Sequence, residues 1–140
     1  MSRDTTTGLR FEEKISINMD GIDLTKHKLY QYLKSKGINY KEIISKKLLP
    51  DECYLVNNHL YVYEKKFQCS AGSADEKPQT CGFKIQQFRK IAKAMGVEEV
   101  SYTYIFNDWF KKPEYKDMLE YIRSIDGCDY KFEEEIINGN

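Results

Sequence analysis

The chain has 140 residues, a length that suits a single domain over residues 1–140 with one hydrophobic core. Its 22 basic and 22 acidic side chains cancel, so the overall charge excludes a polycation that coats nucleic acid indiscriminately. The many tyrosines, phenylalanines, isoleucines and leucines exclude a disordered chain. No apolar run approaches the roughly 18–20 residues of a membrane span, and the polar start does not resemble a secretory signal.

The cysteines are widely spaced along the chain and include no CxxC pair. Neither histidine stands at a zinc-ligand spacing to them, so we do not expect a zinc site. Four cysteines without a secretory signal are typical of free thiols in a reducing cytoplasm, which is the compartment we expect.

The first half of the chain predicts two helices and a hairpin. A short helix is expected over 9–15, and a second helix, capped by Asp23 or Thr25, is expected to end at Gly37. The segment 38–44 fits either a strand or a helix. Two β-prone runs, 53–56 and 60–67, are separated by a short polar turn and predict an antiparallel hairpin.

The second half predicts a loop followed by alternating helices and strands. Residues 70–80 are rich in small polar residues and predict a loop, and 82–95 carries apolar residues at helical spacing. A strand is expected over 100–106, a helix over 113–125 beginning at a proline, and an edge strand over 129–137. The order predicts an α/β domain around a central sheet.

The zero net charge hides a strong segregation along the chain. Residues 1–25 carry a net charge of −2, residues 26–93 of +8, and residues 94–140 of −6. Solvated helix faces rich in lysine and glutamate would explain this. A basic surface for an anionic polymer would explain it equally well.

The end of the second hairpin strand groups an acid, a lysine and an amide. Side chains alternate across a strand, so Glu64, Lys66 and Gln68 should share the face of Leu60 and Val62. Polar groups that continue an apolar stripe are costly to bury without a purpose. Such a short pattern also fits a frayed strand end at which Lys66 pairs with Glu64 in solvent.

Three further features favour a metal-dependent site. An antiparallel hairpin should bring Asp51, which follows Pro50, alongside positions 64 to 66. Two converging carboxylates can hold Mg²⁺, and a lysine beside the ion can position an attacking water and offset charge on a phosphate. Glu12 is a candidate for an outer-shell or second-metal contact. Glu52 could replace Asp51, and Glu13 could replace Glu12.

These motifs resemble those of the PD-(D/E)XK nuclease superfamily, and in particular small type II restriction endonucleases. The likeness covers roughly residues 7–106 and rests on the following segments: Thr7-Gly8-Leu9-Arg10-Phe11-Glu12, Pro50-Asp51, Tyr63-Glu64-Lys65-Lys66-Phe67-Gln68, Gly72-Ser73-Ala74-Asp75-Glu76-Lys77 and Gln79-Thr80-Cys81. It implies a restriction-endonuclease-like core of helix, three-stranded antiparallel meander, helix and strand, here with a C-terminal helix.

The resemblance also implies an activity, the hydrolysis of double-stranded DNA with Mg²⁺, for which Mn²⁺ can substitute. Asp51 and Glu64 would be metal ligands, assisted by the backbone carbonyl of Lys65. Lys66 would be the catalytic lysine, and Gln68 an accessory residue. We expect a homodimer, because one active site cuts one strand and a two-fold pair matches a palindromic sequence.

The loop and helix after the hairpin carry residues suited to DNA phosphates or base edges. These candidates are Ser70, Ser73, Lys77, Gln79, Thr80, Lys84 and Gln87. They are equally compatible with ordinary solvated positions on a loop and an amphipathic helix.

Three alternative functions stay open at the level of sequence. A Holliday-junction resolvase-like enzyme has the same size and core, but would prefer four-way junctions irrespective of sequence. A non-catalytic nucleic-acid or protein-binding module could retain the fold, although it would not need two converging carboxylates. A structural domain with a coincidental motif would bind no Mg²⁺.

Overall fold

The computed structural model describes residues 15–69 and 77–138, and within them one five-stranded sheet. Glu12, Ser70 and Ser73, together with the predicted first helix up to residue 14, lie outside the described residues. The strands are β1 (Ile22–Asp23), β2 (Glu52–Val56), β3 (His59–Lys66), β4 (Glu99–Phe106) and β5 (Cys128–Phe132). The helices are α2 (Lys28–Ser35), α3 (Cys81–Ala94), α4 (Lys116–Ser124) and α5 (Glu133–Asn138), with 3-10 helices η1 (Tyr40–Glu42), η3 (Lys77–Thr80), η4 (Asp108–Lys111) and η5 (Pro113–Tyr115).

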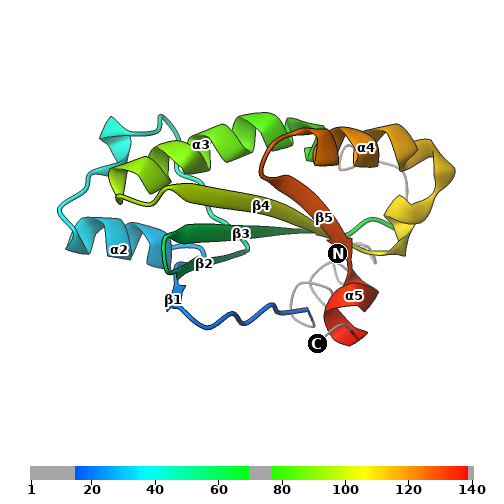
Figure 1. Cartoon of the computed structure of the whole chain (residues 1–140), viewed down its shortest axis with the longest axis horizontal. Coiled ribbons are helices and arrows are strands. Elements are labelled where there is room, and N and C mark those ends of the chain that lie inside the picture. Colours follow the sequence, from blue (N-terminus) through cyan, green and yellow to red (C-terminus); the bar gives the residue numbers. More distant parts are fainter. Residues whose placement is uncertain (1–14, 70–76, 139–140) are drawn as a thin grey trace, which may run out of the picture.

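The sheet is mixed, and its strands lie in the order β1-β2-β3-β4-β5. The strands β1, β2 and β3 pair antiparallel, whereas β4 and β5 pair parallel to their preceding neighbours. The helices α3 and α4 occupy the two parallel crossovers, where α3 packs on β4 and α4 on β5 (Figure 1). This arrangement confirms the predicted α/β class.

Hydrophobic side chains pack on both faces of the sheet. The larger core includes Leu60 and Val62 of β3 together with Phe88 and Ile91 of α3. A smaller cluster gathers around Ile15 and Ile105, with contributions from α5 and from the segment before β1. Figure 1 shows that segment and α5 on the side of the sheet away from α3.

The predicted hairpin is confirmed, with β2 and β3 joined by the two residues Asn57 and Asn58. Val56 pairs directly with His59, so the histidine belongs to the strand rather than to the turn. Asn57 has a φ of 55°, a left-handed conformation that asparagine tolerates better than most residues. This tight connection sets the register of the whole hairpin.

The helix predicted over 82–95 and the strand predicted over 100–106 are confirmed as α3 and β4, each with slightly different ends. The undecided segment 38–44 contains only the 3-10 helix η1. The helix predicted to begin at Pro113 starts as η5 and continues as α4.

Two expectations about element ends are wrong. Asp23 lies in β1, and the N-cap of α2 is His27, so neither Asp23 nor Thr25 caps that helix directly. The predicted edge strand 129–137 ends at Phe132, where α5 begins. The three glutamates of the first turn of α5 complement the partial positive charge of a helix N-terminus, and Glu135 accepts a hydrogen bond of 2.7 Å from the Phe132 amide.

Over 15–69 and 77–138, every helix is too short or too polar to cross a lipid bilayer. The four cysteines, all within the described residues, form no disulfide.

Candidate active site at the open end of the hairpin

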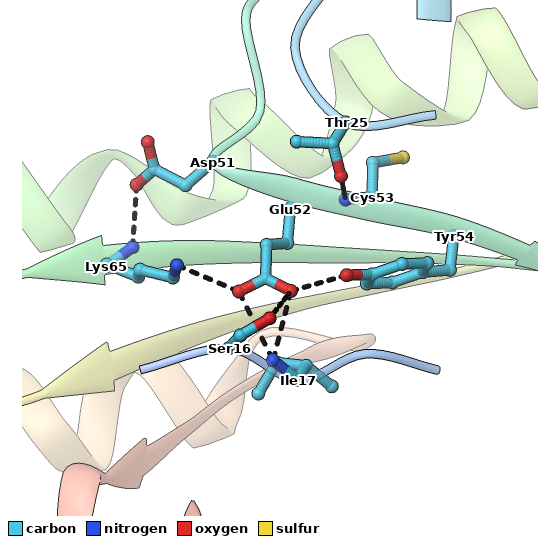
Figure 2. A network of polar contacts seen from close by, with 8 residues as sticks. All are labelled: Ser16, Ile17, Thr25, Asp51, Glu52, Cys53, Tyr54 and Lys65. Carbon is cyan, nitrogen blue, oxygen red and sulfur yellow. Dashed lines mark hydrogen bonds and ion pairs between the residues drawn. The ribbon is translucent and has the colours of Figure 1, made fainter. Parts of the chain in front are cut away.

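The register of the hairpin brings Asp51 beside Glu64. Glu52 pairs with Tyr63 across the two strands, and Asp51 and Glu64 each lie one residue beyond that pair, at the end opposite the turn. The backbone amide of Lys65 donates a 2.8 Å hydrogen bond to Oδ2 of Asp51 (Figure 2). The predicted juxtaposition of the two carboxylates is therefore present in the structure.

The surroundings of Glu64 leave its negative charge poorly compensated. Burial raises the pKa of Glu64 to about 8, and the charge of Asp51 and a hydrogen bond with it act in the same direction. The ammonium groups of Lys66 and Lys84 oppose this rise in the pKa but do not cancel it. Two acids and two lysines thus lie within electrostatic reach of one another at the end of β3.

The carboxylate pair fits a divalent cation that keeps much of its water shell. Mg²⁺ is commonly held by one or two carboxylates, waters and substrate phosphate oxygens. Among the described residues, no group of three or more histidines, cysteines and acids is placed to hold an ion. A cation between Asp51 and Glu64 would supply the positive charge that this pair lacks, so the donor set fits Mg²⁺ with additional water or phosphate ligands.

Glu52 lies on the opposite face of the hairpin, as strand alternation requires. The residue is 4% exposed, and its carboxylate bonds Lys65 Nζ at 2.8 Å and accepts hydrogen bonds from the Ile17 amide at 3.0 and 3.2 Å. It also accepts hydrogen bonds from Tyr54 OH at 2.5 Å and Ser16 Oγ at 3.3 Å (Figure 2). Asp51, rather than Glu52, is therefore the acid beside Glu64.

The partners of Glu52 stabilise its charged form. Burial alone would raise its pKa, but the hydrogen bonds from Lys65, Tyr54 and Ile17, with the charge of Lys65, hold the pKa below its usual value. Lys65 thus contributes to both faces, since its side chain binds Glu52 and its backbone amide binds Asp51.

A buried asparagine that sequence reasoning missed fixes the chain just beyond β3. Asn107, 9% exposed, donates a 2.7 Å hydrogen bond from Nδ2 to the Gln68 carbonyl, and its Oδ1 accepts one of 3.3 Å from the Gln68 amide. The predicted accessory residue Gln68 therefore lies outside the strand, with its backbone held against the end of β4. The only sign of Asn107 in the sequence is that a polar residue directly follows the aromatic run 100–106.

The predicted DNA-contact residues differ in their exposure to solvent. Lys77, Gln79 and Thr80 are exposed on η3, and Lys84 is partly exposed near Glu64. Gln87 is only 8% exposed, and among the described residues its Oε1 has no hydrogen-bond partner. Its predicted role as a surface contact is at odds with this burial, because Gln87 lies one turn before the fully buried Ile91 of α3.

No family model, curated protein or solved structure matches the chain. The geometry around Asp51 and Glu64, together with the motifs that surround them, is therefore what bears on the function of the chain.

Proposed function

We propose that the protein is a Mg²⁺-dependent endonuclease that hydrolyses phosphodiester bonds of double-stranded DNA. The observation that carries the proposal is the meeting of Asp51 and Glu64, with Lys66 beside them. These are the residues through which the chain resembles PD-(D/E)XK nucleases. The acid pair is poorly compensated, as expected where a cation and a phosphate must be accommodated.

The order of the elements also supports a restriction-endonuclease-like core. An antiparallel meander, β1 to β3, is followed by α3 and by the strand β4, which pairs parallel to β3. This is the order of meander, helix and strand that the resemblance implies. It places the acid pair at the edge where β3 ends and the chain turns toward α3.

Each residue has a defined role in this proposal. Asp51 and Glu64 would hold Mg²⁺ or Mn²⁺, with the Lys65 carbonyl assisting, and the bound ion would supply positive charge to the phosphate and acidify a water. Lys66 positions the attacking water and offsets charge that develops on the phosphate oxygens. The hydrogen bonds of Asn107 to Gln68 hold the backbone next to Lys66, so Asn107 is a positioning residue.

The side chains around η3 supply a surface for the DNA backbone. Lys77, Gln79 and Thr80 are exposed directly before α3, and Lys84 lies one turn into that helix. Lysines and hydroxyls at such positions suit phosphate oxygens. These residues belong to the part of the chain that carries a net charge of +8.

Sequence-specific cleavage by a homodimer is the finer part of the proposal. One acid pair cuts one strand, and two copies related by a two-fold axis would cut both strands of a palindromic site. A resolvase-like enzyme would also act as a dimer, but on a four-way junction. Substrate choice separates these two enzymes.

The proposal is tested by incubating mixed-sequence duplex DNA and a four-way junction with the protein and Mg²⁺, and then mapping the ends. Discrete ends at one sequence support a restriction enzyme, whereas cleavage of the junction irrespective of sequence indicates a resolvase. Lys66→Ala should abolish cleavage and leave DNA binding largely intact, and Lys116→Ala on α4 is the matched control. DNA binding with no cleavage in Mg²⁺ or Mn²⁺ would instead indicate a non-catalytic module.

A further inference from the structure

A second candidate site lies beside α2, away from the acid pair. A pocket of about 450 Å³ is formed by the C-terminal half of α2 and the segment that follows it. Figure 1 shows α2 near the start of β3, whereas Glu64 lies close to the end of that strand. The pocket is therefore separate from the candidate active site, and its volume lies within the range of roughly 300–1,000 Å³ common for small-molecule sites.

The walls of the pocket combine flat aromatic and aliphatic surface with two cationic groups. The partly exposed Ile38 and Tyr40 provide most of the accessible apolar surface, and the buried Leu33 and Tyr30 also line the pocket. The two tyrosine rings meet edge to face, with their centroids 5.0 Å apart. Lys47 Nζ lies 4.7 Å from the Tyr30 ring centroid and 5.2 Å from that of Tyr40, so a cation is held next to aromatic surface.

Hydrogen bonds hold this arrangement in place without a ligand. The hydroxyl of Tyr30 accepts a 2.6 Å hydrogen bond from the Leu48 amide and donates one to the Leu48 carbonyl. Because Lys47 directly precedes Leu48, these bonds tie the segment that carries the lysine to α2. The floor of the pocket is thus preorganised, which lowers the entropic cost of binding.

The charge around the pocket favours an anion. Residues 26–47 contain seven lysines and a single acid, Glu42. The pocket lysines Lys34 and Lys47 form no salt bridge with an acidic side chain of the described residues. Their ammonium groups can therefore pair with a negatively charged ligand without first breaking an ion pair.

We propose that this pocket binds a nucleotide, whose phosphate contacts Lys34 and Lys47 and whose base packs against Tyr40 and Ile38. The nucleotide would be a free nucleoside monophosphate or the phosphorylated end of a DNA strand, since both present the same chemistry. Inorganic phosphate would leave the apolar wall uncovered. This proposal goes beyond the nuclease activity and does not depend on it.

Calorimetric titration of the whole protein without divalent metal tests the proposal. Deoxyadenosine monophosphate should bind more tightly than inorganic phosphate or deoxyadenosine alone, because only the nucleotide uses both parts of the pocket. Short oligonucleotides with and without a 5′ phosphate distinguish a free nucleotide from the end of a DNA strand. If the pocket takes a strand end, only the phosphorylated oligonucleotide should bind. In NMR spectra of the same titrations, amides in 30–47 should shift and those of 64–66 should not.

Variants link the binding to the pocket. Lys34→Gln/Lys47→Gln should weaken nucleotide binding by about tenfold or more, and Lys34→Gln alone should weaken it by less. Lys36→Gln, which removes a neighbouring charge that does not line the pocket, should change affinity by less than about twofold. Tyr40→Leu should remove the preference for nucleotide over phosphate.

Three outcomes would overturn the inference: no binding of any nucleotide, equal loss in the pocket and Lys36 variants, or shifts confined to 64–66. Lys66→Ala should abolish cleavage and leave nucleotide binding unchanged, so failure of the nuclease proposal can be told apart from failure of this one.

Discussion

Two sets of acids and lysines lie on opposite faces of the same hairpin: Glu52 with Lys65, and Asp51 and Glu64 with Lys66. On one face Glu52 has a complete set of partners, and the pKa of its carboxyl is lowered. On the other face Glu64 lies beside a second acid, and its pKa is raised to about 8. Both sets contain a glutamate and a lysine of the hairpin, but strand alternation turns one set toward residues 16 and 17 and the other toward Asp51.

The difference shows how a structural ion pair can be distinguished from a candidate catalytic group. The Glu52–Lys65 pair is enclosed, with side-chain exposures of 6% and 7%, and it anchors residues 16 and 17 to the sheet. In the pair of Asp51 and Glu64, burial and the neighbouring acid keep Glu64 mainly neutral at pH 7, and acids with pKa values shifted in this way cluster at functional sites. The first set should control folding and the second should control activity.

The largest expected effect is on activity. Asp51→Asn should lower DNA cleavage by about 10²–10³-fold or more, because it removes one of two candidate metal ligands and preserves the shape of the side chain. Rates with Mg²⁺ on a mapped DNA substrate measure this effect. The thermal unfolding of this variant should stay close to wild type, and full activity would remove Asp51 from the site.

On the face that carries Glu52 and Lys65, a substitution should lower stability. Lys65→Met leaves the buried charge of Glu52 without its ion-pair partner and should lower the free energy of unfolding by about 3–5 kcal/mol. Its neighbour Lys66 is the matched control, since Lys66→Met should change stability by only about 0.5 kcal/mol. Urea unfolding followed by circular dichroism compares the two.

The double variant Glu52→Met/Lys65→Met sharpens that comparison. Removing both charges should restore much of the stability lost in Lys65→Met, because no buried charge is then left unpaired. A double variant as unstable as the single one would show that the lost hydrogen bonds to Glu52 or the packing, rather than the unpaired charge, account for the loss.

A smaller effect of opposite sign is expected at Glu64. Because the pKa of Glu64 is about 8, Glu64→Gln mimics the neutral form that prevails at pH 7, and it should raise the free energy of unfolding of the metal-free protein, by up to about 1 kcal/mol, only above pH 8, where the two carboxylates repel each other. The corresponding change Glu52→Gln should lower it. If both variants are destabilised equally, the two faces do not differ in the way that their hydrogen bonds imply.

Much of this site could be predicted because local chemistry determines it. The Asn57-Asn58 turn sets the register, and the register places Asp51 opposite Glu64. Alternation along β3 then puts Glu64 and Lys66 on the face of Val62. The choice between Asp51 and Glu52 stayed open, because the position of the first paired residue cannot be read from the sequence with single-residue accuracy.

Most features that could not be predicted from the sequence depend on contacts between distant segments. Glu52 is recognised as structural only through Ile17 and Ser16, 35 and 36 residues away, and Asn107 reaches Gln68 across 39 residues. Gln87 looked like a surface contact because its type is polar, whereas tertiary packing buries it. The end of β5 was missed for a local reason, since three consecutive glutamates favour a helix N-terminus over a continued strand.

The smallest expected effect concerns Asp23, an exposed counterpart of Glu52. Slight burial raises its pKa, but hydrogen bonds from Thr25 and Lys28 outweigh this and lower the pKa from 3.8 to about 2. The carboxylate therefore contributes its full stability above about pH 4, and that contribution declines as the pH falls from about 4 through about 2. Because this acid and Lys28 are largely solvent-exposed, Asp23→Asn should cost less than about 1 kcal/mol at pH 7. Unfolding at pH 7 and pH 2 should show a much smaller difference from wild type at the lower pH, and 1 M salt should reduce the difference at pH 7. A cost as large as that of Lys65→Met would mean that exposure does not separate the two acids, and that hydrogen bonding alone sets what each contributes.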